Sequence, residues 1–172
     1  MDGQFFATRY KEHRLDELLQ AVDDAERNLF GRFYPSVVLP EILAEKPDLV
    51  GISILNFQQV IPGLTLAKQL KSNGLRVVIG GTVYTKFVDS LRAVPEFFKL
   101  CDAVVVYEGE SALVKLTRAI AENPVQPDLN NIPNLIWFDG EKVRVNEPFH
   151  AEAITQLPCP DFNGLPLNSY LA

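Results

Sequence analysis

Short apolar runs alternate with amphipathic stretches through the middle of the chain. The runs cover residues 48–55, 76–79 and 103–106 and are almost continuously apolar, which is typical of parallel strands buried on both faces. Residues 60–72, 83–94 and 111–123 carry apolar side chains at three- and four-residue steps, the spacing of a helix face. This alternation predicts an α/β fold with an open, doubly wound, mostly parallel sheet, of the flavodoxin-like or Rossmann-like kind.

The chain before residue 48 has a different pattern. Residues 8–30 are predicted to form one amphipathic helix, and residues 37–46 a second, shorter one. Domains of this fold usually begin with a strand, so we expect that the first strand is missing from this sequence. The face of the longer helix is formed by Leu15, Leu18, Leu19, Val22 and Leu29.

The chain after residue 124 changes again. Residues 134–138 and 142–145 are rich in β-formers and flank Asp139-Gly140, which predicts a C-terminal β-hairpin. Residues 151–172 are proline-rich and irregular, as in a linker. We therefore divide the chain into a helical segment (1–47), an α/β core (48–124), a hairpin (125–150) and a linker (151–172).

Composition narrows the class of protein. The 172 residues suffice for one domain, and 47% hydrophobic and 22% charged residues are ordinary for a globular protein. A net charge of −6 argues against a nucleic-acid surface, and no apolar run approaches the roughly 20 residues of a membrane span. The two cysteines, Cys101 and Cys159, form no CxxC pair, which fits a reducing, cytoplasmic location.

Ligands of open α/β sheets bind beyond the carboxyl ends of the strands, which nominates the loops 53–57, 80–84 and 107–111. Gly80-Gly81 would let the backbone pass close to a ligand, or would simply make a tight turn. The Ser53 hydroxyl could bond a buried ligand or only the local backbone. Glu108 and Glu110 straddle Gly109 before a helix for which Ser111 is a plausible N-cap, and could serve the helix dipole or a ligand.

Several well-known motifs are absent from the sequence. It contains no GxGxxG, no GxxxxGK[ST] and no GxSxG. The sequence therefore gives no support for dinucleotide binding, a phosphate-binding P-loop or an α/β-hydrolase mechanism.

In combination, the segments 48–53, 77–81 and 102–110 resemble the N-terminal cobalamin-binding domain of radical SAM proteins. The hairpin and the exit at 157–162 are also similar to that family, in which they lead into the iron–sulfur domain. Ser53-Ile54-Leu55 matches the SxL signature of cobalamin-binding folds, and Gly80-Gly81 matches the GG signature. The resemblance implies that Ser53 and Leu55 pack along the nucleotide tail of cobalamin, that Gly80 and Gly81 make room for it, and that Thr82, Glu108 and Gly109 join the cofactor-binding residues.

The sequence departs from the wider pattern at the DxHxxG signature. His13 lies in Lys11-Glu12-His13-Arg14-Leu15, without the aspartate and glycine of the motif, so we expect no histidine lower ligand to cobalt from this chain. The chain also lacks the CxxxCxxC motif that holds a [4Fe-4S] cluster and S-adenosylmethionine. No catalytic or metal-ligating residue is therefore expected here; the resemblance places that chemistry in a downstream radical SAM domain, for methyl transfer or a related radical reaction.

Three functions remain open at this stage. The first is a cobalamin-binding module of a radical SAM enzyme. The second is a degenerate scaffold that binds no cofactor and serves substrate recognition or domain docking. The third is a flavodoxin-like binder of another nucleotide. The SxL and GG pair favours the first function, and the missing histidine favours the second.

Overall fold

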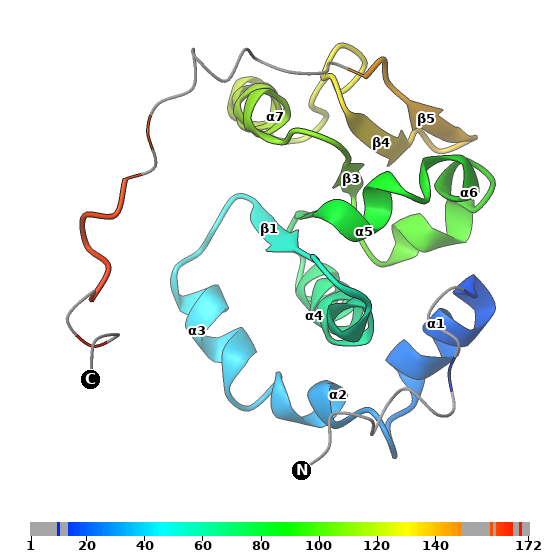
Figure 1. The fold of residues 1–172 in the computed structure, drawn as a ribbon, viewed down its shortest axis with the longest axis vertical. Coiled ribbons are helices and arrows are strands. Elements are labelled where there is room, and N and C mark those ends of the chain that lie inside the picture. Colours follow the sequence, from blue (N-terminus) through cyan, green and yellow to red (C-terminus); the bar gives the residue numbers. More distant parts are fainter. Residues whose placement is uncertain (1–9, 11–13, 149–158, 160, 167–168, 170–172) are drawn as a thin grey trace.

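The computed structural model describes residues 10, 14–148, 159, 161–166 and 169, which form an α/β fold (Figure 1). The sheet has five strands in the order β1-β2-β3-β4-β5. The strands are β1 (Val50–Ser53), β2 (Val77–Gly80), β3 (Ala103–Val105), β4 (Leu135–Phe138) and β5 (Val143–Val145). The helices are α1 (Leu15–Asp23), α2 (Leu29–Phe33), α3 (Val38–Ala44), α4 (Val60–Ser72), α5 (Thr82–Thr85), α6 (Val88–Arg92) and α7 (Glu110–Glu122), with 3-10 turns η1 (Phe57–Gln59) and η2 (Pro95–Lys99).

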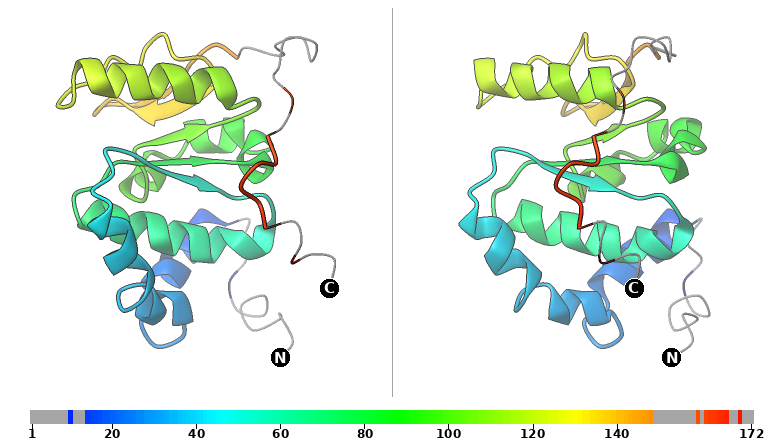
Figure 2. Two further views of the ribbon diagram at one scale, coloured as in Figure 1. Left: turned by 90° about the vertical axis from the view of Figure 1, so that its left-hand side faces the viewer. Right: turned by 60° about the vertical axis from the view of Figure 1, so that its left-hand side comes forward.

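The sheet is mixed, and helices cover both of its faces. Strands β1, β2 and β3 are parallel, whereas β4 and β5 are antiparallel to their neighbours. Right-handed crossovers that advance in one direction along the sheet leave their helices on one face, which is where α4, α5 and α6 contribute to the core. Helix α7 connects β3 to an antiparallel strand and lies on the opposite face from α4 (Figure 2). The predicted α/β fold, its mostly parallel core and the C-terminal hairpin are confirmed.

Alternation of side chains along the strands divides the core into two layers. On the α4 face, Val77, Ile79 and Val104 pack with Leu64 and Leu70 and are fully buried. On the α7 face, the buried cluster is formed by Val78, Ala103, Val105, Ala112, Leu116, Ile120, Ile132 and Leu135. Strands β2 and β3 are buried on both faces, which explains their continuous apolar runs, whereas β1 is exposed at Gly51 and Ser53.

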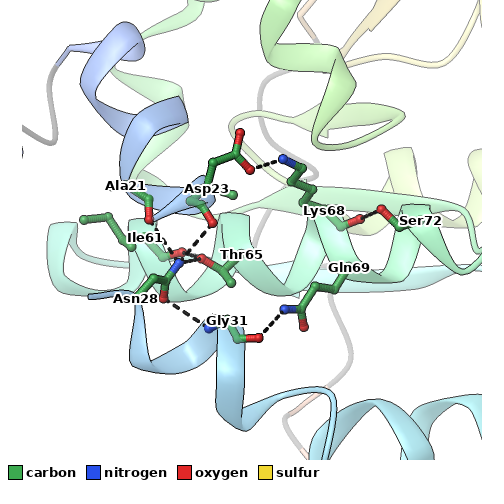
Figure 3. A network of polar contacts seen from close by, with 10 residues as sticks. Ala21, Asp23, Asn28, Gly31, Ile61, Thr65, Lys68, Gln69 and Ser72 are labelled. Atoms are coloured by element: carbon green, nitrogen blue, oxygen red, sulfur yellow. Dashed lines mark hydrogen bonds and ion pairs between the residues drawn. The ribbon is translucent and has the colours of Figure 1, made fainter. Parts of the chain in front are cut away.

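The expected single helix over residues 8–30 is wrong, because the chain breaks between α1 and α2 at Asn28. The buried Asn28 amide donates from Nδ2 to the Ala21 and Val22 carbonyls at the end of α1, and its Oδ1 accepts from the Gly31 N–H in α2. Nδ2 also donates to the Thr65 hydroxyl of α4, at 2.8 Å. Figure 3 shows how this one side chain ends one helix, begins the next and ties both to α4.

Two further boundaries differ from the sequence pattern. The predicted helix over 83–94 is two helices, α5 and α6, followed by η2. Ser111 is not an N-cap: α7 begins at Glu110, and Gly109 precedes it without a side-chain cap.

In the hairpin, Gly140 has φ +102°, and Asp139 Oδ1 accepts from the Glu141 and Lys142 N–H groups, both at 2.8 Å. Most of the predicted linker, 151–172, lies outside the described residues.

Candidate functional site

A groove of about 310 Å³ lies on the α7 face of the sheet, along the carboxyl ends of β1 and β2. It exists because α7 covers β3 and β4 but leaves this part of β1 and β2 bare. Its volume is at the lower end of the range of small-molecule sites, about 300–1,000 Å³. The groove is lined by Gly51, Ile52, Ser53, Val78, Ile79, Gly80, Gly81, Val105, Tyr107, Gly109 and Leu113.

The floor of the groove is open because Gly51, Ser53 and Gly80 leave β1 and β2 with small side chains or none at these positions. Gly51 pairs with Val78, and Ser53 pairs with Gly80, so these residues point to the same face. A Cβ atom on Gly51 would meet nothing closer than Val78 Cγ1, at 3.9 Å. A Cβ atom on Gly80 would meet the Val105 carbonyl oxygen at 3.5 Å, an ordinary contact. The fold therefore does not require glycine at these two positions, and their small size leaves the groove free.

Gly81 differs from Gly80, although the sequence treats them as a pair. Its φ is +110°, and a Cβ atom there would lie 2.2 Å from the Ile54 carbonyl oxygen. Such a contact with backbone cannot be relieved by moving a side chain. Gly81 is thus required by the turn from β2 into α5, whatever binds in the groove.

The wall of the groove is formed by the loop between β3 and α7. Tyr107 has a left-handed backbone, with φ +59°, and its N–H donates to the Thr85 hydroxyl at 3.0 Å. Gly109 follows at the start of α7, and Leu113 extends the wall along the helix with 41% of its surface exposed. The groove is therefore mainly apolar, with the Ser53 hydroxyl near its floor.

The residues expected from the sequence are only partly brought together. Ser53, Gly80, Gly81 and Gly109 line the groove, but Leu55, Thr82 and Glu108 do not. The Leu55 side chain is 58% exposed, and its carbonyl accepts from the Thr82 hydroxyl at 3.0 Å. Glu108 is exposed, and its backbone carbonyl accepts from Asn134 Nδ2 at 2.8 Å. Thr82 therefore joins two of the loops, and the Glu108 backbone joins the third loop to β4.

Sequence reasoning missed Gly51 and Asn134. Gly51 interrupts the apolar run 49–52, and a glycine inside a strand is a known sign of close approach by a ligand or backbone. Asn134 precedes β4, is buried, and has φ +60°. Its contact with Glu108 spans 26 residues, so no local pattern indicates it.

The titratable groups with the largest changes lie away from the groove. Burial raises the pKa of the Cys101 thiol, and burial also raises the pKa of the Tyr84 hydroxyl. Both groups therefore stay protonated at neutral pH, which makes Cys101 a core residue rather than a nucleophile. Within the described ranges, no three His, Cys, Asp or Glu side chains are grouped to hold a metal ion; His13 and His150 fall outside those ranges.

The chain is similar to an enzyme of known structure, the radical S-adenosylmethionine methyltransferase TsrM from Kitasatospora setae, solved with a tryptophan substrate and an analogue of S-adenosylmethionine. The two are 25% identical, with a TM-score of 0.54. The match covers 77% of this chain and 26% of the methyltransferase, so the chain spans about a quarter of that protein. This likeness supports the α/β fold and, at a coarse level, a relation to radical SAM methyltransferases.

No protein-family model matches the chain, and no curated protein sequence matches it. Among the described helices, none is both long and apolar enough to cross a bilayer.

Proposed function

We propose that this chain is the cobalamin-binding module of a cytoplasmic radical SAM enzyme. The observation that carries the proposal is the glycine floor of the groove, at the edge of the sheet where ligands of open α/β folds bind. The SxL and GG segments contribute Ser53, Gly80 and Gly81 to this groove. The likeness to a radical SAM methyltransferase supports the same context.

The residues of the groove fit one part of cobalamin. A volume of about 310 Å³ suits the flat nucleotide tail, while the much larger corrin ring would lie outside it, above the loops. The mainly aliphatic and glycine lining suits the apolar faces of an aromatic base. The tail would lie over Gly51 and Gly80, because a side chain at either position would occupy that space.

Each residue then has a physical task. Ser53 can donate or accept a hydrogen bond at the edge of the tail, and Val105 and Leu113 keep water from its face. Gly81 shapes the turn, and Thr82 holds the Leu55 backbone against it through the hydroxyl–carbonyl bond. Leu55 and Glu108 are exposed beside the groove, where they could contact the parts of the cofactor that stay outside. Without a histidine ligand to cobalt from this chain, the tail in the groove would be the main attachment of the cofactor.

The chemistry of the parent enzyme would belong to cobalamin and to a partner domain. Bound cobalamin supplies a cobalt ion that can carry a methyl group. The partner is a radical SAM domain with a [4Fe-4S] cluster and S-adenosylmethionine, and the reaction is methyl transfer or related radical chemistry. The module would present the corrin face to that domain.

One observation favours a second function, a scaffold without a cofactor. The floor residues Gly51 and Ser53 are exposed, because no described helix covers β1 on the α7 face. A docked domain could cover this surface in place of a cofactor tail.

Titration of the purified chain with hydroxocobalamin tests the proposal. Visible absorbance and retention on a desalting column would be followed, with flavin mononucleotide as the matched control ligand. Co-elution of hydroxocobalamin, but not of the flavin, is expected. Retention of the flavin would favour another nucleotide binder. If hydroxocobalamin binds neither this chain alone nor the chain joined to a radical SAM domain, the cobalamin proposal is wrong and the scaffold function is favoured.

A further inference from the structure

Asn134 stands immediately before β4 in a conformation that few residues adopt. Its backbone φ is +60°, and only 2% of its surface is exposed. Glycine enters this region without strain, and asparagine is one of the few other residues that tolerates it. A buried asparagine at such a position indicates that the amide itself makes a required contact.

The contacts of Asn134 reach the loop that forms the wall of the groove. Its Nδ2 donates to the Glu108 carbonyl at 2.8 Å, and its own carbonyl accepts from the Val106 N–H at 2.9 Å. These bonds fall on either side of Tyr107. The Tyr107 N–H donates to the Thr85 hydroxyl of α5. The loop is thus attached both to the hairpin and to α5.

Tyr107 needs such attachment. A bulky aromatic residue in the left-handed region is strained, and strain of this kind persists only where surrounding structure holds it. Tyr107 lines the groove, and so does Gly109 two residues later. The position of the wall therefore depends on how firmly residues 106–109 are held.

We infer that Asn134 is a positioning residue for the groove: its amide fixes the 106–109 loop so that Tyr107 and Gly109 form the ligand-facing wall. The inference rests on the proposed function as far as the ligand is concerned. The geometry of the loop can be tested without a ligand.

Two substitutions separate the amide from the backbone. Asn134→Gly keeps the left-handed backbone and removes the amide; Asn134→Asp keeps the size but places an oxygen where Nδ2 donates. Hydrogen exchange of the 107–109 amides in the ligand-free protein is expected to become about tenfold faster in both variants, and hydroxocobalamin binding about tenfold weaker. The melting temperature of the Asn134→Gly variant should stay within a few degrees of wild type, because relief of backbone strain offsets the lost bond.

Asn146, in the same hairpin, provides the matched control. Its Nδ2 donates to the Leu129 and Ile132 carbonyls, at 2.6 and 2.8 Å, and these bonds do not involve the groove loop. Asn146→Ala should lower the melting temperature while leaving the 107–109 exchange and the hydroxocobalamin affinity unchanged.

The result that would overturn the inference is wild-type exchange at 107–109 in the Asn134→Gly variant, or an equal loosening of this loop by Asn146→Ala. If wild-type protein fails to bind hydroxocobalamin while exchange responds as expected, the proposed function falls and the positioning role of Asn134 stands.

Discussion

Strands β1 and β2 present two very different faces. On the α4 side, the paired Ile52 and Ile79 pack into a dense aliphatic core. On the α7 side, one residue further along, the paired Ser53 and Gly80 leave a groove. The backbone and the register are shared, so the difference between the faces comes from the side chains and from the helices that cover each face.

The two faces contribute to different properties: the α4 face to folding stability, and the α7 face to space for a ligand. Full burial of an aliphatic side chain such as that of Ile79 contributes about 1.5–3 kcal/mol, whereas glycine and an exposed serine contribute little. Substitutions on the α4 face should therefore change the free energy of unfolding. Substitutions on the α7 face of these strands should change binding instead.

The largest effect is expected at Gly81, which the turn requires, in contrast to Gly80, which only leaves space in the groove. Gly81→Ala would force a Cβ atom to within 2.2 Å of the Ile54 carbonyl oxygen at a φ of +110°. We expect a loss of more than about 3 kcal/mol in unfolding free energy, measured by urea denaturation. A loss below about 1 kcal/mol would mean that the turn can be rebuilt without glycine.

The next effect compares the two faces directly. Ile79→Ala on the packed face should cost about 2–5 kcal/mol, because it opens a cavity in the core. Ser53→Ala on the groove face should cost less than about 0.5 kcal/mol, since the residue is exposed. Equal costs by denaturation would remove the distinction between the faces.

The smallest effect is expected in the hairpin turn, away from both faces. Backbone N–H bonds from Lys142 and Glu141, with a contribution from Arg144, lower the pKa of Asp139 to about 2. Because the folded-state pKa is depressed, the stabilisation is present above the unfolded value near 4 and is lost as the pH falls through about 2. The difference in melting temperature between wild type and Asp139→Ala should be small at pH 6 and should vanish toward pH 2. A difference that persists unchanged at pH 2 would show that the turn does not depend on this carboxylate.

Much of the α/β core could be predicted, because its signals are local. The apolar runs predict β1, β2 and β3, and Asp139-Gly140 predicts the hairpin, because strand burial and turn chemistry depend on neighbouring residues. The break at Asn28 was missed because the helical spacing of apolar residues continues across it. What ends α1 is a side chain bonded to Thr65, 37 residues away.

The site was predicted less completely, for the same reason. The family resemblance singled out Ser53 and Gly80, which line the groove, but also Leu55 and Thr82, which do not. A glycine inside the β1 run was a sequence signal for Gly51, but only the register, which places it beside Val78, assigns it to the open face. The φ angles and neighbouring atoms were needed to show that Gly81 is required by the backbone, whereas Gly80 leaves space for a ligand.

The most direct test of the glycine floor fills the groove without disturbing the fold. Gly51→Val has space for its side chain and favours a strand, so its unfolding free energy should equal or exceed that of wild type by up to about 1 kcal/mol. Ala121→Val, on an exposed position of α7 that does not line the groove, is the control. Hydroxocobalamin retention would be measured for both variants beside wild type. We predict that the Gly51→Val protein is folded and loses retention of hydroxocobalamin while the control keeps it; undiminished retention by a folded Gly51→Val protein would contradict a glycine-floored binding site.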